Sequence, residues 1–447
     1  MKVFLFLDDW FLDGRIDAVR CYANPEPEPV LQPHRLGVST IIYDPEQKKF
    51  RAWAKIGVEK QARLYESPNG IDWHVTRHRM AVFPRQNFYE QNWFYDTFDP
   101  DPDRRHKMLV WPYEKNTYGG PGLVATSPDG IRWTNRPDMA WSPPQGRGSD
   151  TRNNIFYNPL SKQWSVICRK WHADRRVAMV TSPDLHQWSQ PKVLLQPDTL
   201  DAPLQQFYGM SVLPYENDWF IGFLQCYHVP QENGGCPGEE RLSMHGYVDT
   251  QLVHSIDGEC WVRGPRTPFL DRTSPGTYGG GSLYGCEAAA GPDGRILIFA
   301  RGTLRQHGNA DLPKGYPARS GLLVYPLRRD GFAYLTPVGR QGTVTTRPLV
   351  PEKGKLTLNV EAPLGQVRVR AEAPDGSVYP GYSFHDCSPV TGDQTEAVVR
   401  WGKRRGLTGL VGKPLRLTFR LTDARLYAFR LQCGVWYTTT AEPLDHV

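Results

Sequence analysis

Two runs of apolar residues, separated by a short polar turn that contains Pro, recur five times along the first three quarters of the chain. Each run has the length of a β-strand, and Pro, Asp, Asn and Gly in the turns favour a chain reversal. The pattern therefore predicts five β-hairpins. They cover residues 38–55, 92–111, 152–170, 208–226 and 284–302.

A second pattern, Ser-x-Asp/Asn-Gly-x-x-Trp, accompanies these hairpins at spacings of 60, 55 and 73 residues. Adjacent Asp and Gly residues supply the positive φ angles of a tight turn, so we interpret the Asp residues as turn formers. A third strand ending at this turn and a fourth after the Trp make four strands per unit, and five units predict a five-bladed β-propeller. The copies are Ser67–Trp73, Ser127–Trp133, Ser182–Trp188 (without the Gly), Ser255–Trp261 and a degenerate Arg329–Tyr334.

The repeat stops after Pro337, and residues 355–383 and 413–432 alternate between polar and apolar side chains. Such alternation over about 100 residues is typical of an antiparallel β-sandwich. The sequence thus predicts an all-β protein: a five-bladed propeller over residues 1–340 and a C-terminal β-sandwich over residues 341–447.

Composition narrows the function classes. The 447 residues are 39% hydrophobic and 22% charged, and the net charge of +6 is spread along the chain, which argues against a nucleic-acid partner and mildly favours an anionic substrate. Apolar runs are too short for a membrane span or a signal peptide, so we expect a cytoplasmic protein, or a secreted or periplasmic one if a leader was removed. None of the eight Cys residues forms a C-x-x-C pair, so we expect free thiols, no metal and no cofactor. Oligomeric state stays open.

The inner strands of a propeller converge on an axial pocket, and this geometry selects candidate site residues. The starts of inner strands and the ends of second strands are rich in Arg, Asn, Gln, Trp and Tyr. Aromatic faces pack on pyranose rings, while amides and guanidinium groups bind hydroxyl and carboxylate groups, so the pocket is expected to bind a carbohydrate. The candidate binding residues are Arg35, Arg85, Asn92, Trp111, Arg152, Asn153, Arg169, Trp171, His172, Gln206, Tyr208, His228, Tyr284 and Arg301.

Acidic residues are few at these positions, which matters because glycoside hydrolysis requires two carboxyl groups facing each other across the bond. Asp150 lies in the polar run GRGSDTRNN, and Glu287 lies in the small, apolar strand YGCEAAAG. We predict Asp150 as the base or nucleophile and Glu287 as the general acid, with Asp249 as a third candidate. A strand cap for Asp150, and a salt bridge to Arg152, Arg169 or Arg301 for Glu287, are the structural alternatives.

Several segments resemble the five-bladed propellers of the glycoside hydrolase family 32/43-like superfamily: LFLDDWFLD, RLYESPNGIDW, LVATSPDGIRW, DTRNNIFYNP and VTSPDLHQWSQP. The resemblance covers the whole chain and implies an exo-acting glycosidase with a funnel-shaped pocket and a C-terminal β-sandwich. The signature Trp-Met-Asn-Asp-Pro-Asn-Gly and the Arg-Asp-Pro motif are absent, and the Glu-Cys motif is reversed as Cys286-Glu287. Residue roles are therefore not transferred from that superfamily.

The turn motif also resembles the Asp-box of sialidases, in which one residue separates Asp from Gly. Sialidases have six blades, a Tyr nucleophile and three Arg residues that bind a carboxylate. The resemblance implies that such a clamp would here be drawn from Arg35, Arg85, Arg152, Arg169 and Arg301.

The leading hypothesis is a glycoside hydrolase that removes a terminal sugar, with an acidic sugar favoured, from an oligo- or polysaccharide. The alternatives are a non-catalytic carbohydrate-binding propeller, and a uronate lyase or sialidase-like enzyme with a Tyr or His base and an Arg clamp. The sugar, the linkage and the stereochemical outcome stay open.

Overall fold

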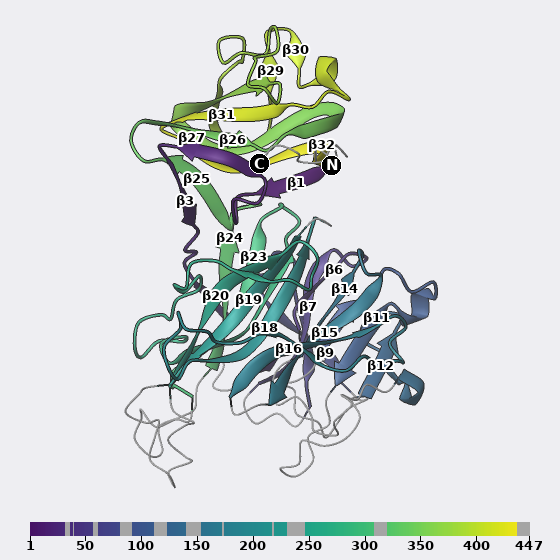
Figure 1. Ribbon diagram of the computed structural model, residues 1–447. Coiled ribbons are helices and arrows are strands. Elements are labelled where there is room, and N and C mark those ends of the chain that lie inside the picture. Colours follow the sequence, from purple (N-terminus) through teal and green to yellow (C-terminus); the bar gives the residue numbers. More distant parts are fainter. Residues whose placement is uncertain are drawn as a thin grey trace, which may run out of the picture. The chain divides into compact units, whose positions relative to one another are not determined.

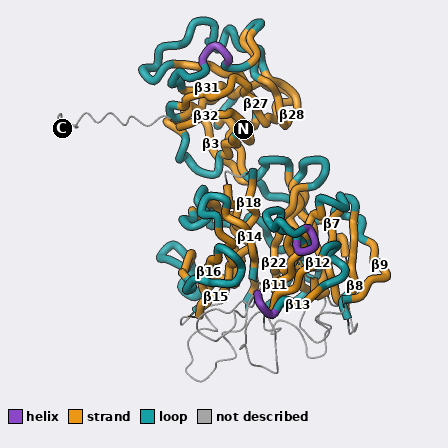
Figure 2. The backbone as a smooth tube through the Cα atoms, turned by 90° about the vertical axis from the view of Figure 1, so that its right-hand side faces the viewer, coloured by secondary structure: helices purple, strands orange, loops and turns teal. Residues whose placement is uncertain are grey.

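The computed structural model describes residues 1–31, 36–38, 40–56, 61–80, 92–110, 123–139, 153–171, 174–216, 219–229, 246–307 and 320–435. The chain divides into two compact units, Asn24–Leu327 and Met1–Ala23 together with Arg328–Val447. Strands dominate both units (Figure 2). Within the described ranges, helical turns occur only at η2 (Pro102–Arg104), η3 (Pro137–Met139) and η6 (Thr408–Leu410), and no helix is long and apolar enough to cross a membrane.

Five separate antiparallel sheets form the unit Asn24–Leu327 (Figure 1), which confirms the predicted five-bladed propeller. Blade I has β5 (Leu36–Val38), β6 (Ile42–Asp44), β7 (Lys49–Ile56), β8 (Arg63–Ser67) and β9 (His74–Arg79). Blade II has β10 (Asn92–Tyr95), β11 (His106–Val110), β12 (Leu123–Ser127) and β13 (Thr134–Asn135). Blade III has β14 (Asn154–Asn158), β15 (Gln163–Trp171), β16 (Arg175–Ser182) and β17 (Lys192–Leu195). Blade IV has β18 (Gln206–Tyr215), β19 (Trp219–His228), β20 (Tyr247–Ser255) and β21 (Val262–Arg263).

Blade V takes its outermost strand from near the N-terminus. Its strands β22 (Ser282–Ala290), β23 (Ile296–Thr303) and β24 (Ser320–Leu327) are completed by β4 (Glu28–Leu31), which pairs antiparallel with β24. A strand from near the N-terminus thereby completes the last blade and closes the ring. The degenerate motif Arg329–Tyr334, predicted as the fifth blade turn, instead leads into β25 (Ala333–Pro337) of the other unit.

The second unit is built around one nine-stranded sheet with the order β2-β26-β31-β27-β32-β25-β3. The 24-residue strand β27 (Leu349–Glu372) pairs with β32 over its first half and with β31 over its second half, so the sheet folds over into the predicted β-sandwich. Strand β1 joins β32, β28 joins β27, and β29 and β30 form a separate hairpin. The strands are β1 (Lys2–Leu5), β2 (Leu12–Ile16), β3 (Ala18–Tyr22), β26 (Gln341–Thr346), β28 (Val390–Val398), β29 (Arg400–Trp401), β30 (Arg404–Arg405), β31 (Arg416–Thr422) and β32 (Arg425–Val435).

The unit boundaries differ from the expected division at residue 340, because the N-terminal strands belong with the sandwich (Figure 1, purple strands beside yellow-green ones). Phe4 of β1 stacks on Phe429 of β32 with ring centroids 4.4 Å apart, and Phe11 meets the same ring edge-on at 5.9 Å. All three rings are buried. The apolar N-terminal run is thus part of the sandwich core.

The propeller core lies between the blades. Four buried clusters each combine side chains of two neighbouring blades. Between blades I and II, Trp53 of β7 packs in one cluster with Trp93 of β10 and with Trp133, and the last two rings meet edge-on at 5.8 Å. Between blades V and I, Phe299 packs on Phe50 at 5.8 Å. Each blade therefore completes its core only with its neighbours.

The repeated turn motif is a contact between blades as well as a chain reversal. Within the turn of blade II, backbone N–H groups of Ile131 and Arg132 donate to Asp129 Oδ1. Burial would raise the pKa of Asp129, but these donors outweigh it and lower the pKa to about 2. The Asp129 carbonyl in turn accepts from Arg51 Nη1 of blade I at 2.7 Å. The turn is thus held from within and from the neighbouring blade.

Two separate features favour glycine in the turn of blade II. Gly130 has a φ of +70°, and a Cβ there would lie 2.5 Å from Trp93 Cζ2. The copy in blade III has Leu185 in place of Gly, and Leu185 adopts the same left-handed conformation, with a φ of +64°. Its side chain is buried in the cluster between blades II and III.

We expect Gly130→Ala to lower the free energy of unfolding by about 2–4 kcal/mol, from left-handed strain plus overpacking against Trp93. Gly276→Ala is the matched control, because Gly276 has a φ of +85° and a Cβ added there would have no atom within 4 Å. Strain alone predicts a loss of about 1–2 kcal/mol there. Denaturant titration followed by tryptophan fluorescence measures both, and equal losses would contradict the interblade contact.

Candidate functional site

The inner strands begin at one end of the propeller, where side chains cross between blades. Thr40 Oγ1 donates to Asn92 Oδ1 between blades I and II at 3.4 Å, and the Val212 N–H donates to Asn154 Oδ1 between blades IV and III at 2.9 Å. These polar contacts satisfy buried groups and fix the neighbouring strands relative to each other. The second strands end at the same edge, because each hairpin is antiparallel.

Tyr208, near the start of β18, is the centre of an aromatic cluster at this end. Its ring meets Tyr284 of blade V at 5.3 Å, His307 at 5.3 Å and Tyr227 of β19 at 6.1 Å, in each case edge-on. Tyr227 and His307 also contact each other, with ring centroids 5.0 Å apart. The cluster thereby joins blades IV and V around one phenol ring.

Three arginines pack against these rings. The Arg169 guanidinium lies 4.6 Å from the Tyr208 ring and donates to the Tyr208 carbonyl at 2.5 Å. Arg175 lies 5.2 Å from the Tyr227 ring, and Arg301 lies 5.3 Å from the Tyr284 ring. Cation–π contacts of this kind hold guanidinium groups in a fixed orientation.

Two of the predicted binding residues help to place these arginines. Gln206 accepts a hydrogen bond from Arg175 Nη1 through its Oε1 atom at 2.8 Å. Tyr208 supplies both the ring and the carbonyl that hold Arg169. Asn92 and Asn153 are buried at the same end of the propeller. The structure therefore brings Arg169, Gln206, Tyr208, Tyr284 and Arg301 together, and their role in binding a substrate stays a prediction.

His228 and Asp249 form a pair at the end of β19 and the start of β20. Nε2 of His228 lies 2.8 Å from Oδ2 of Asp249, and the imidazole stacks on Tyr247 at 4.6 Å and 19°. Asp249 is 3% exposed, so the carboxylate itself is buried. Burial, and next the Asp249 charge, raise the pKa of Tyr247. The candidate carboxylate Asp249 therefore lies against the His228 imidazole.

Glu287 lies on β22 just after a β-bulge between Tyr284 and Glu287, where Gly285 has a φ of +57°. The bulge shifts the side chains that follow it relative to β23. Oε2 of Glu287 accepts a hydrogen bond from the Ile41 N–H of blade I at 2.8 Å, and the side chain is buried. Glu287 thus links blades V and I.

The remaining predicted residues lie outside the described residues, namely Asp150, Arg35, Arg85, Trp111, Arg152 and His172. Trp171 ends strand β15, of which only the backbone is described at that position. Within the described ranges, no group of three or more His, Cys, Asp or Glu side chains is placed to hold a metal ion.

Sequence reasoning selected Tyr227 as a second-strand end that faces the pocket, but it missed two members of the cluster, Arg175 and His307. Arg175 begins β16, the third strand of its blade, and Tyr227 is the penultimate residue of β19. Third-strand starts are expected to face the same mouth, so that rule would have selected Arg175. His307 follows β23 and pairs by an isolated bridge with Gly246, a contact that no sequence pattern indicates.

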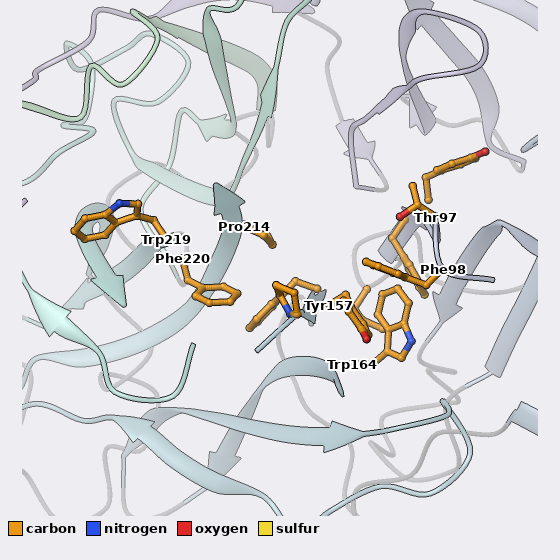
Figure 3. Close-up of a pocket in the computed structure, with 12 residues that line it drawn as sticks. Thr97, Phe98, Tyr157, Trp164, Pro214, Trp219 and Phe220 are labelled. Carbon is orange, nitrogen blue, oxygen red and sulfur yellow. The ribbon is translucent and has the colours of Figure 1, made fainter. Parts of the chain in front are cut away.

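An aromatic pocket of about 340 Å³ lies at the opposite ends of the inner strands of blades II, III and IV (Figure 3). Tyr157 and Trp164 lie in the middle of the view, Thr97 and Phe98 on one side, and Pro214, Trp219 and Phe220 on the other. Phe98 is 60% exposed and packs on Tyr157 at 4.1 Å. The pocket contains no carboxylate or histidine among its lining residues, so we place the chemistry at the other end.

Comparison with known proteins shows likeness at the level of structure. No protein-family model and no curated protein sequence matches the chain. A thermostable family-43 glycoside hydrolase has 12% identity and a TM-score of 0.46 over 70% of this chain and 95% of its own. A family-32 β-fructofuranosidase from Bombyx mori has 12% identity and a TM-score of 0.44 over 92% and 94%. An exo-β-1,3-galactanase from Phanerochaete chrysosporium has 11% identity and a TM-score of 0.41 over 92% and 99%.

These structural neighbours are glycoside hydrolases, including members of families 43 and 32. At identities of 11–12% and TM-scores below 0.5, the likeness says nothing about which residues act or on what.

Burial in the cluster has a measurable consequence for Tyr227. Burial raises its pKa from 10.0 to about 12, and the Arg175 charge opposes this only in part. Between pH 10 and pH 12, Tyr227 therefore keeps its proton in the native protein but loses it in the unfolded chain. The stability that the buried, protonated Tyr227 contributes is complete below pH 10 and is lost as the pH rises towards 12. We expect Tyr227→Phe to show a shallower decline in unfolding free energy over this range than the wild type. Identical slopes would contradict the burial of this hydroxyl group.

Proposed function

We propose that the protein is a glycoside hydrolase that removes a terminal acidic sugar from an oligo- or polysaccharide. The observation that supports this best is the packing of Arg169, Arg175 and Arg301 on three tyrosine rings at the inner-strand starts. Carbohydrates bind to sites that combine aromatic faces with a few fixed polar groups. Guanidinium groups add selectivity for a carboxylate or sulfate on the sugar, because they form charge-assisted, bidentate hydrogen bonds.

Hydrolysis in this proposal uses Asp150 as the nucleophile or base and Glu287 as the general acid. Glu287 lies on the inner strand of blade V, which also carries Tyr284, the register partner of Arg301. Oε2 of Glu287 accepts a hydrogen bond from the Ile41 N–H. In this proposal Glu287 keeps that hydrogen bond while it donates a proton to the leaving oxygen. Exo action, and the degradation of polysaccharides from their ends, follow from a pocket that takes one terminal residue.

A uronate lyase is the second candidate, and a different observation favours it. His228 and Tyr247 stack at the same end as the arginines, and the described carboxylates Asp249 and Glu287 both already have partners. β-Elimination needs a base for the proton next to the carboxylate and cations that neutralise that carboxylate, but it needs no pair of opposed carboxyl groups. An unsaturated product that absorbs ultraviolet light would identify this reaction, whereas hydrolysis gives a saturated sugar.

A matched panel of oligosaccharides tests the preference for acidic sugars. We expect products from chains that end in a uronic acid or sulfated sugar and not from their neutral counterparts. Arg301→Met should lower kcat/KM on the acidic chains by about 10–100-fold, the value of a charged hydrogen bond of about 1.5–3 kcal/mol. Arg266→Met is the control, since Arg266 pairs with Asp198 and Asp201 away from the tyrosine cluster. Binding without product from any chain would instead indicate a carbohydrate-binding propeller.

The role of Glu287 is separable from its interblade contact. Glu287→Gln keeps an oxygen acceptor for the Ile41 N–H but has no transferable proton, whereas Glu287→Ala loses both. If Glu287 is the acid, Glu287→Gln should fold like the wild type and lose turnover by about 10²–10⁴-fold. Asp150→Asn should be equally inactive while still binding the sugar. Full activity of Glu287→Gln, with instability confined to Glu287→Ala, would show that Glu287 only joins the blades.

A further inference from the structure

Two arginines of the sandwich unit face each other across neighbouring strands. Arg368 of β27 and Arg420 of β31 are register partners in an antiparallel pair, so their side chains leave the same face of the sheet. Arg370, two residues further along β27, pairs with Glu372 at 2.7 Å, whereas neither Arg368 nor Arg420 has an acidic partner among the described residues. Like charges directly opposite each other destabilise a sheet, so an anion bound between them would relieve a repulsion that the free protein bears.

Phe384 gathers Arg368, Arg370 and Arg420 into one group, the sandwich arginine cluster. The guanidinium of Arg420 lies 3.9 Å from the centre of the Phe384 ring, and that of Arg370 lies 4.9 Å from it. Arg368 Nη1 donates to the Phe384 carbonyl at 3.1 Å and to the Cys387 carbonyl at 2.8 Å. These contacts fix three cations beside one another, and all three side chains stay in part exposed, 32% in the case of Arg370.

Hydroxyl and amide side chains continue the same face of the sheet. Thr343 of β26 is the register partner of Arg420 on its other side, and Gln341 and Gln366 are both register partners of Thr422. Such groups donate to and accept from sugar hydroxyls. The Phe384 ring is only 8% exposed, so it offers no free face on which a nucleic-acid base could stack. The face therefore suits a charged carbohydrate better than a nucleic acid.

The positive charge of the chain is concentrated in the sandwich unit. Of the 53 Lys and Arg and the 47 Asp and Glu, the residues of this unit include 20 and 15, so almost all of the net charge of +6 resides there. Such an excess attracts a polyanion from a distance. We propose that the sandwich arginine cluster binds the carboxylate or sulfate groups of an acidic polysaccharide, at a site separate from the propeller pocket. The choice of a polysaccharide rests on the proposed function, but binding at this site requires no cleavage.

Affinity electrophoresis of the full chain tests the class of ligand. The gels contain polygalacturonate, its fully methyl-esterified form or chondroitin sulfate, and the retardation of the protein gives the Kd. We expect retardation by the two acidic polymers, weakening as salt is added, and none by the methyl ester, which keeps the sugar rings without their charge. No retardation by either acidic polymer, or equal retardation by the methyl ester, overturns the inference. Tighter binding to single-stranded DNA or to phosphatidylserine vesicles overturns the choice of a polysaccharide.

Charge variants locate the binding within the sandwich unit. Arg420→Gln should raise the Kd for polygalacturonate about 5–30-fold, because it removes a charge-assisted hydrogen-bond donor. Thr343→Glu should weaken binding at least as much, since it places a carboxylate beside Arg420. Arg425→Gln is the matched control, because Arg425 lies on β32 and pairs with Glu361, and it should change the Kd by less than about twofold. Unchanged binding in the first two variants, or an equal loss in the control, overturns the inference; circular dichroism checks that each variant is folded.

Activity separates this inference from the proposed function. On a short acidic oligosaccharide, Arg420→Gln should keep the kcat/KM of the wild type, because the sandwich arginine cluster takes no part in the reaction. Retardation without cleavage of any acidic chain means that the proposed function fails while the sandwich site stands. Cleavage without retardation, or retardation that survives Arg420→Gln, means that the propeller alone binds the polymer and overturns this inference.

Discussion

The propeller depends on one recurring contact, in which a blade holds the backbone carbonyl of the tight turn in the next blade. Arg51 of blade I is nearly completely buried, and it binds both the Asp129 carbonyl of blade II and the Asp44 carboxylate of its own blade. Asn158 of blade III repeats the contact by donating to the Asp257 carbonyl of blade IV at 2.7 Å. Buried carbonyls need such donors, and a buried guanidinium needs acceptors, so each partner is satisfied only when two blades dock.

This constraint explains why the chemistry can gather at one end of the propeller. The buried contacts and shared cores between blades fix the positions of the inner strands relative to one another. The first residues of these strands can then be polar without weakening the packing of the blades. Tyr208 illustrates this, because it contacts arginines of blade III, a tyrosine of its own blade and a tyrosine of blade V. The side chains of a site built from three blades are held in place only as accurately as those blades pack against one another.

The buried cations of this site lie against aromatic rings. Arg169 and Arg175 are both nearly buried, and each lies over a tyrosine. Burial raises the pKa of Tyr284 and of Tyr227 above the ordinary value of 10.0, so these phenols stay neutral hydrogen-bond donors well above physiological pH. Neutral donors and fixed cations together are the basis on which we propose an anionic sugar as the ligand.

The blade count, the strand order within each blade and the presence of a sandwich could be predicted from the sequence, because local turn chemistry and alternating apolar residues carry that information. The rule that strand starts and ends converge also selected Arg169, Gln206, Tyr208, Tyr284 and Arg301 as neighbours. In contrast, the closure of blade V by β4 and the place of Phe4 in the sandwich core became visible only in the folded chain, because both depend on pairings between distant segments. The same holds for Asp249, which the sequence presents as a lone acid and the fold pairs with His228 across two strands.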